Sequence, residues 1–364
     1  MKPRLLLFPP VNSSLIRKEA EMFSDEYDVR IFDLRSTSKI TMPFRLVLQF
    51  FFLLKNIWRT EIMVSRFVGY QTILPVFFSK LTGKPVVCIM GGLECIKFPS
   101  VKTGSYIKPF FGAVTKWCLK NATHLCPVHD SLILTDYTYQ DDDYPKQGYK
   151  YFVPDCNTPV TVIRNGYDAQ KWKRTREKIP STFITVAHGI EEDHLYRLKG
   201  IDLIMQIAPF YPQNTFTIAG GKKELLGEKV PSNVRFVGEV ANERLHDLLS
   251  SQEYYLQLSI TEGFPNALCE AMLCECIPIG SNVGAIPEII NDEKLVLKRK
   301  DVEQLKIIID HALTLDKKAA SESARERIKN NFPLERRAES FLDLFVQLLK
   351  NKPQRPQGFT EKRM

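Results

Sequence analysis

The segment Thr261–Met272 reads TEGFPNALCEAM, and it follows the largely apolar stretch Tyr254–Leu258. The apolar and aromatic residues of that stretch predict a β-strand. Gly263 and Pro265 predict a turn, and Pro265 fits the first turn of a helix, where its missing N–H costs nothing. The segment therefore predicts a strand, a turn and a helix, with the turn at the carboxyl end of the strand. Ligands of parallel α/β sheets bind at that end.

The same alternation of strands and helices continues on both sides of this segment. In the second half we expect strands at Thr182–Ala187, Thr215–Ala219, Val234–Val237, Cys276–Ile279 and Leu295–Leu297, with helices at Gly200–Ala208, Glu243–Ser251 and Ile286–Ile290. In the first half we expect strands at Arg4–Phe8, Tyr27–Phe32, Glu61–Ser65, Lys84–Met90, Thr123–Val128 and Val160–Ile163, with helices at Leu15–Phe23 and Thr72–Leu81. This order implies parallel sheets with crossover helices, so the fold class is α/β with two Rossmann-like, doubly wound domains.

A change in composition marks the boundary between the two domains. The turn Arg164–Asp168 is followed by Lys171–Lys178, a charged stretch without apolar periodicity. We therefore expect an N-terminal domain over residues 1–168 and a C-terminal domain over residues 169–332. We expect residues 333–350 to form a helix that packs back toward the N-terminal domain, and residues 351–364 to be a disordered basic tail.

The composition is that of an ordinary globular protein. The chain has 364 residues, of which 44% are hydrophobic and 25% charged, and this length favours two domains over one compact core. Its net charge of +8 suits an anionic partner, which leaves a nucleotide, a phosphorylated lipid and a membrane surface open. No nucleic-acid partner is expected.

The eight cysteines are scattered singly through apolar stretches, without a C-x-x-C pair or zinc-finger spacing. They are typical of small buried hydrophobic residues in a reducing compartment. The N-terminus lacks the long apolar region and cleavage site of a signal peptide, so we expect a cytoplasmic protein.

Two further segments leave alternatives open. The stretch Phe44–Trp58 is too short and too interrupted to span a membrane, and it fits either a buried core helix or a helix on the inner surface of the cell membrane. The acidic run Asp141–Asp143 contains a D-x-D pattern, but it lies in a polar loop rather than after a strand. We interpret it as a solvated loop and expect no metal site.

The opening segment has the chemistry of a site for a phosphorylated sugar compound. The N–H groups of Asn266, Ala267 and Leu268 lie in the first helical turn, where the helix dipole favours a phosphate or diphosphate. Glu262 lies beside this anion site and Glu270 lies in the helix. Because carboxylates repel phosphate, they are better suited to accept hydrogen bonds from sugar hydroxyls.

These residues resemble the E-x7-E motif of retaining glycosyltransferases of family 4, which have the GT-B fold. The resemblance continues through AMLCECIPIGSNVGAIPEII at Ala271–Ile290, and it includes Val162–Asp168, Lys199–Asp202, the strands around FTIAGG and RFVGEV, and the run Gly69–Gly92. It implies a transferase that uses a nucleotide sugar as donor substrate, without a cofactor, and a glycan or lipid-linked acceptor. The donor would bind in the C-terminal domain and the acceptor in the N-terminal domain. Surface polysaccharide biosynthesis is the expected setting.

The resemblance also implies roles for individual residues. Glu262 would hold the transferred sugar, Glu270 the ribose, and Lys199 the departing diphosphate. The expected catalytic set is Glu262, Lys199, Arg197 and Glu94. The expected donor-binding set is Gly263, Phe264, Pro265, Asn266, Ala267, Leu268, Glu270, Gly220, Gly238, Glu239, Val240 and His188. Glu288 is expected to complement the dipole of its own helix.

The chain departs from the family pattern at three places. His188 stands where the family usually has an arginine, and Arg197 is the expected substitute. Met90-Gly91-Gly92-Leu93-Glu94 replaces a His-Gly pair, so Glu94 is expected to face the sugar or the acceptor. The loop Phe8–Ser14 lacks the usual Gly-Gly. These departures keep open a catalytically silent scaffold or nucleotide-sugar-binding subunit, and another GT-B enzyme such as an epimerase.

Overall fold

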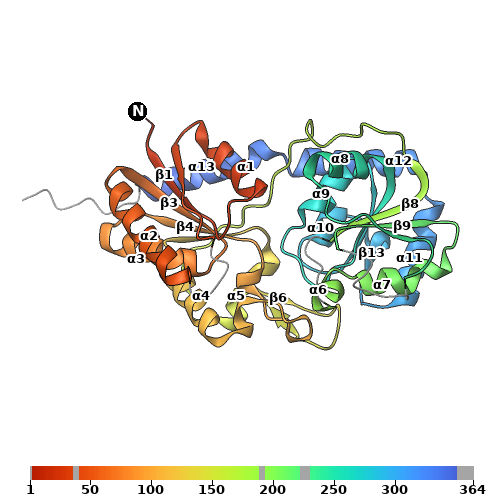
Figure 1. Cartoon of the computed structure of the whole chain (residues 1–364), viewed down its shortest axis with the longest axis horizontal. Coiled ribbons are helices and arrows are strands. Elements are labelled where there is room, and N and C mark those ends of the chain that lie inside the picture. Colours follow the sequence, from red (N-terminus) through yellow and green to blue (C-terminus); the bar gives the residue numbers. More distant parts are fainter. Residues whose placement is uncertain (1, 36–40, 188–192, 222–229, 351–364) are drawn as a thin grey trace, which may run out of the picture.

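The structure is a computed structural model, and it describes residues 2–35, 41–187, 193–221 and 230–350. These residues form two parallel-sheet domains that lie side by side, with the N-terminal domain in red to yellow and the C-terminal domain in green to blue (Figure 1). The two doubly wound α/β domains expected from the sequence are therefore confirmed.

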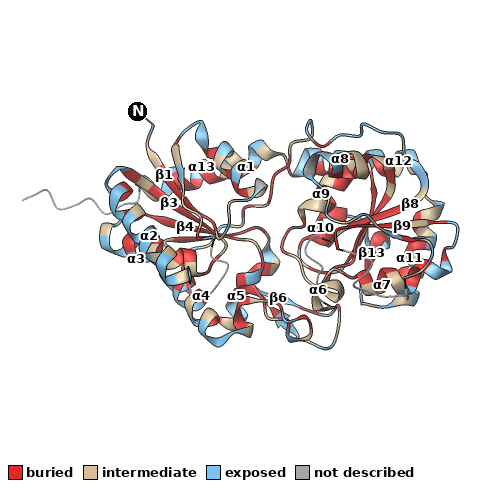
Figure 2. Cartoon of the chain, in the orientation of Figure 1, coloured by how far each residue is buried: buried red, intermediate tan, exposed pale blue. Residues whose placement is uncertain are grey.

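The N-terminal sheet has five parallel strands in the order β2-β1-β3-β4-β5. They are β1 (Arg4–Phe8), β2 (Asp28–Ile31), β3 (Thr60–Arg66), β4 (Val86–Met90) and β5 (His124–Pro127). The apolar runs of β1 and β4 are completely buried between two layers of helices, as expected for a sheet covered on both faces (Figure 2). The strand expected at Val160–Ile163 is wrong: Val160 forms only an isolated parallel bridge to Leu125.

The helices of this domain divide between the two faces of the sheet. The chain runs from β1 to β2 in one direction and through β3, β4 and β5 in the other, and right-handed crossovers then place the helices on opposite faces. Helix α1 (Ser14–Ser24) contacts α13 (Leu334–Lys350), whereas α3 (Tyr70–Thr82) packs against both α2 (Thr41–Asn56) and α4 (Pro109–Asn121). The sequence interpretation did not identify α4.

The C-terminal sheet has six parallel strands in the order β10-β9-β8-β11-β12-β13. They are β8 (Ile179–Val186), β9 (Thr215–Ala219), β10 (Val234–Phe236), β11 (Gln252–Gln257), β12 (Ile277–Ser281) and β13 (Val296–Leu297). The strand order reverses between β8 and β11, and ligands of this fold bind outside the carboxyl ends of the strands at such a point. The segment Thr261–Met272 follows β11, so it lies at this point.

The helices around this sheet are α6 (Asp193–Leu198), α7 (Ile201–Ile207), α8 (Asn242–Ser251), α9 (Asn266–Leu273), α10 (Ile286–Ile290), α11 (Val302–Thr314) and α12 (Lys317–Asn331). Helix α6 lies in a stretch that the sequence interpretation left as a long loop. Within the N-terminal domain, a short hairpin of β6 (Thr135–Asp136) and β7 (Lys146–Gln147) is followed by α5 (Tyr149–Phe152).

The chain crosses between the domains twice, and the two crossings are hydrogen-bonded to each other. The N–H of Tyr167 donates to the Phe332 carbonyl at 2.9 Å, and the N–H of Leu334 donates to the Tyr167 carbonyl at 3.1 Å. After the second crossing, α13 packs against α1 through an aromatic cluster in which Phe23 contacts Phe341 and Phe345. The C-terminal helix is thus part of the N-terminal domain (Figure 1). The tail at 351–364 lies outside the described residues.

All eight cysteines are buried free thiols. Across the described part of the chain, none of the helices combines the length and the hydrophobicity needed to cross a bilayer. The run Asp141–Asp143 is not simply solvated, because Asp143 accepts hydrogen bonds from the N–H and hydroxyl of Ser100 at 3.1 and 2.6 Å. Asp141 pairs with Arg299 of the C-terminal domain at 2.6 Å.

Candidate active site

An ion pair forms the centre of the site. The Nζ of Lys199, at the end of the α6 segment, lies 2.7 Å from Oε1 of Glu262, in the turn after β11. The same oxygen accepts hydrogen bonds from the hydroxyl of Ser259 at 3.0 Å and from Nε2 of Gln257 at 3.3 Å. The side chains of Lys199 and Glu262 are 28% and 16% exposed. Two residues expected to act on the same donor therefore lie together and remain accessible.

The turn after Glu262 requires a glycine. A Cβ at Gly263 would lie 2.1 Å from the carbonyl oxygen of Gly91 in the N-terminal domain, so the two domains touch at this point. Gly284 has a φ of +53°, and a Cβ there would lie 2.0 Å from the Glu262 carbonyl oxygen. The N–H of Ala285 also donates to the Gly263 carbonyl at 3.0 Å. The turn is thus fixed by the backbone on both sides.

The start of α9 contacts the interdomain linker, by which we mean residues 163–171. Oδ1 of Asn266 accepts hydrogen bonds from Asn165 Nδ2 at 3.1 Å and from the Tyr167 hydroxyl at 2.8 Å. Phe264 is buried and stacks on Tyr167, so the side chains of both Phe264 and Asn266 contact the linker. No side chain among the described residues caps the helix start at Pro265.

Glu270 lines a cavity of about 270 Å³ between the two domains. Lys18 of α1 and Lys171 of the linker line it from the other sides, and Val186, Leu245 and Trp172 add apolar surface. Burial raises the pKa of Glu270 to about 7, against the opposing charges of Lys18 and Lys171. The cavity combines a carboxylate, two lysines and apolar walls, which suits a polar ligand with an aromatic or apolar part.

Lys18 is a site residue that the sequence interpretation missed. Its Nζ donates to the Gly166 carbonyl at 2.8 Å and lies 5.2 Å from the centre of the Tyr167 ring. Burial lowers its pKa. A single lysine on an amphipathic helix carries no sequence signal of this kind, because only the three-dimensional fold brings α1 to the linker.

Glu94 is placed differently from the expectation. Its side chain is 1% exposed, and its two carboxylate oxygens accept hydrogen bonds from the N–H groups of Gly91 at 2.9 Å and Gly92 at 3.2 Å. Burial raises its pKa, with these N–H groups and the charge of Arg66 acting in the opposite direction. Glu94 braces the loop that touches Gly263. A role toward the sugar or the acceptor stays a prediction.

Gly220, Gly238, Glu239 and Val240, from the expected donor-binding set, lie at the same sheet edge. The N–H of Gly220, after β9, donates to the Gly238 carbonyl after β10 at 2.7 Å, which ties the two loops together. Glu239 and Val240 continue the second loop. Arg197 is in the last turn of α6, two residues before Lys199. His188 lies outside the described residues.

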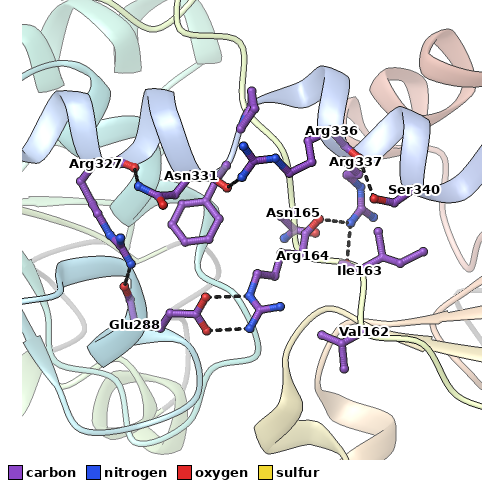
Figure 3. A pocket seen from close by; sticks show the side chains of 12 residues that line it. Val162, Ile163, Arg164, Asn165, Glu288, Arg327, Asn331, Arg336, Arg337 and Ser340 are labelled. Carbon is purple, nitrogen blue, oxygen red and sulfur yellow. Dashed lines mark hydrogen bonds and ion pairs between the residues drawn. The ribbon is translucent and has the colours of Figure 1, made fainter.

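A second cavity of about 320 Å³ is lined by residues of both chain segments that cross between the domains (Figure 3). Arg164 holds both carboxylate oxygens of Glu288, at 2.6 and 3.1 Å, and His129 Nε2 lies 3.0 Å from the same carboxylate. Glu288 lies in the first turn of α10, as expected, and its carboxylate also joins the two domains, which the sequence did not predict. Arg337 donates to the carbonyls of Ile163 and Arg164, so this region acts as a hinge brace.

Among the described residues, no group of three or more His, Cys, Asp or Glu side chains is arranged to hold a metal ion.

Comparisons with known proteins agree with this geometry. Residues 193–332, which contain Lys199, Glu262 and Glu270, match the family Glycosyl transferases group 1. The gpi3 subunit of phosphatidylinositol N-acetylglucosaminyltransferase from Schizosaccharomyces pombe is 29% identical over 186 residues, which are 48% of this chain and 40% of that protein. This chain thus matches less than half of the length of that relative.

Solved structures match almost the whole chain. Sucrose-phosphate synthase from Thermosynechococcus elongatus superposes with a TM-score of 0.73 at 14% identity, over 95% of this chain and 99% of that one. HepE from Anabaena, in complex with UDP and glucose, superposes with a TM-score of 0.68 at 12% identity, over 94% of this chain and 100% of that one. At such identities the likeness concerns the fold, and it confirms the expected GT-B architecture. The chain therefore has the GT-B fold, and its residues 193–332 match the model of the Glycosyl transferases group 1 family.

Proposed function

We propose that this chain is a retaining, metal-independent glycosyltransferase that moves a sugar from a nucleotide diphosphate sugar to a glycan or lipid-linked acceptor. The observation that carries the proposal is the Lys199–Glu262 pair, which lies where the strand order of the C-terminal sheet reverses. The match to the glycosyltransferase family covers both residues. The eight buried free thiols fit a protein in a reducing compartment. Surface polysaccharide or glycolipid synthesis is the setting we propose.

The proposed mechanism uses the charges of this pair. An ammonium group has three protons, and only one is needed for the 2.7 Å contact with Glu262. The other two can donate hydrogen bonds to a diphosphate bound at the start of α9, where the helix N–H groups also favour an anion. In a front-face reaction the departing phosphate oxygen takes the acceptor proton, so stabilisation of the leaving diphosphate is the main task of the protein.

The donor is proposed to extend from Glu262 to the cavity beside Glu270. Glu262 would accept hydrogen bonds from sugar hydroxyls, and Glu270 would accept them from the ribose. The solved structure of HepE with UDP and glucose supports a nucleotide sugar as the donor class. The name of the fission-yeast relative, which refers to phosphatidylinositol, supports a lipid acceptor.

A thermal-shift screen with UDP, GDP, ADP and their sugars tests the proposal, because a ligand that binds the folded state raises its melting temperature. We expect one nucleotide family to stabilise the protein. We also expect transfer products that keep the anomeric configuration of the donor, and an unchanged rate in the presence of EDTA. Isomerisation of the donor without an acceptor would favour an epimerase, and the absence of both binding and transfer would favour a scaffold.

Donor affinity is expected to depend on pH through Glu270. Because its pKa is raised to about 7, the carboxyl group is mostly protonated at pH 6 and mostly ionised at pH 8. The ionised form is the stronger acceptor for ribose hydroxyls, so the dissociation constant should fall about tenfold from pH 6 to pH 8. Calorimetric titration with the intact nucleotide sugar measures this, and Glu270→Gln should flatten the profile. Glu293→Gln, at an exposed carboxylate, is the control.

A further inference from the structure

Helix α2 packs one face against the protein and exposes large apolar side chains on the other. The buried residues of α2 are Gln49, Leu53 and Asn56, which recur at the spacing of one helical face. On the opposite face, five large apolar side chains are exposed: Phe44, Val47, Leu48, Phe51 and Leu54. Trp58, in the turn that follows the helix, is exposed as well. The stretch Phe44–Trp58, for which the sequence left a core helix and a surface helix open, thus packs along one face and exposes apolar side chains along the other.

The neighbouring helices extend this exposed surface. Helix α3 packs against both α2 and α4, and all three cover the same face of the N-terminal sheet (Figure 1). Phe77 and Leu81 of α3 and Phe110 of α4 are exposed. Trp58 and Phe110 have exposed fractions of 80% and 73%, which is unusual for side chains of this size. We call the exposed apolar side chains of α2, α3 and α4, together with Trp58, the aromatic face. In Figure 2 these helices show pale blue on their outer sides.

The aromatic face lies within an unusually basic part of the sequence. Residues 34–129 contain 13 Lys and Arg but only 2 Asp and Glu, Glu61 and Glu94, and Glu94 is buried. The whole chain has a net charge of +8, so the other residues together are net acidic. Lys55, Lys108 and Lys116 are exposed beside the exposed aromatic residues. The segment that carries the aromatic face is therefore the most strongly basic part of the described sequence that we identify, and three of its lysines are exposed near exposed aromatic residues in the chain.

We propose that the aromatic face docks on an anionic lipid bilayer, with its aromatic side chains in the interface and its lysines against the acidic headgroups. Aromatic and aliphatic residues backed by Lys and Arg are the composition that binds such interfaces. A soluble acidic protein would match the charge, but it would leave these large apolar side chains without a matching surface. The proposal deepens the proposed function, because the surface belongs to the domain assigned to the acceptor, and it names lipid-linked compounds as the acceptor class.

Flotation of the full-length chain with vesicles tests this docking. We expect binding to vesicles of phosphatidylcholine with phosphatidylglycerol, weak binding to phosphatidylcholine alone, and loss of binding in high salt because charges at the surface are screened. The double substitution Phe51→Ser and Trp58→Ser should weaken binding to the anionic vesicles at least about tenfold, since each side chain loses its apolar burial. The charge variant Lys108→Glu with Lys116→Glu should weaken it as well.

The controls separate docking from folding and from the donor site. Ile307→Ser removes an apolar side chain that is 68% exposed on α11 of the other domain, and it should bind vesicles as the wild type does. The melting temperature and the nucleotide-sugar affinity of Phe51→Ser/Trp58→Ser should equal those of the wild type. Donor binding without flotation would overturn the docking alone, whereas flotation without donor binding would overturn the proposed function alone.

Two further results would overturn the proposal. One is equal binding of the wild type and Phe51→Ser/Trp58→Ser to anionic vesicles. The other is a concentration-dependent dimer in analytical ultracentrifugation that the same substitution abolishes, because the aromatic face would then be the contact between two copies of the chain.

Discussion

Replacement of Lys199 by alanine is expected to lower kcat for sugar transfer about 10²- to 10³-fold, which is the usual effect of removing one group that stabilises developing negative charge. The Nζ of Lys199 lies 2.7 Å from Glu262 and at the sheet edge where we place the diphosphate. Its positive charge stabilises the diphosphate most when the sugar–phosphate bond breaks and negative charge develops, so kcat should fall more than KM rises. Steady-state kinetics with the donor identified by the thermal-shift screen measure both constants.

Glu262→Gln should act together with Lys199→Ala. The glutamine keeps a side-chain oxygen for Ser259 and Gln257 but loses the charge that positions Lys199. Because the two side chains are in contact, the double variant should lose less activity than the product of the two single losses. Lys298→Ala is the matched control, since Lys298 pairs with Glu293 on the surface of the same domain. Wild-type rates for both site variants would contradict the assignment of this site.

The strands and the donor edge could be predicted because their signals are local. β1 and β9 begin and end at the residues expected, since an apolar run bounded by polar and turn residues is typical of a buried strand. The segment Glu262–Glu270 combines a strand end, a glycine turn and a helix start within a few residues. Its likeness to a known motif then identified Lys199, 63 positions earlier in the chain, as its companion.

The side-chain contacts that the sequence did not predict are mostly long-range. Glu288 meets Arg164, 124 positions away, and nothing in the first turn of α10 indicates that partner. Glu94 is an exception, because its partners, the N–H groups of Gly91 and Gly92, lie in the same tight loop. Lys18 reaches the donor cavity only because α13 and the linker close against α1. Such pairings follow from how the domains pack, which no local pattern encodes.

The hinge connects these long-range contacts to the proposed donor site. Asn165 lines both interdomain cavities, and its Nδ2 donates to Asn266 at the start of α9. Arg337 also lines both cavities, and it holds the carbonyls of Ile163 and Arg164 in the linker. A change in the angle between the domains would therefore move the groups around Glu270 and the turn at Gly263 together. Closure around a donor is the conformational step that this arrangement predicts.

Loss of the negative charge of Glu19, which holds Arg337 of this hinge, is expected to have the largest effect on the free energy of unfolding. Oε1 of Glu19, on α1, lies 2.8 Å from Nη2 of Arg337 and 3.0 Å from Nη1 of Arg66. The two guanidinium groups share this carboxylate, and burial lowers the pKa of Arg337.

This cluster is almost completely shielded from water, since the side chains of Glu19, Arg66 and Arg337 are 4%, 2% and 4% exposed. Glu19→Gln would leave two buried guanidinium groups without a counter-charge. Removing one partner of a buried ion pair typically costs about 3–5 kcal/mol of unfolding free energy. We therefore expect a clear fall in the midpoint of chemical denaturation, followed by circular dichroism.

The control for this prediction lies on the same helix. Glu21 is exposed on α1, and Glu21→Gln should leave the denaturation midpoint within the small range typical of surface substitutions. Arg337→Met should lower the midpoint as well, because it removes one guanidinium from Glu19 together with the hydrogen bonds to the carbonyls of Ile163 and Arg164. If Glu19→Gln were as stable as Glu21→Gln, the carboxylate would not hold α13 against α1. The packing of Phe23 against Phe341 and Phe345 would then have to fix the helix alone.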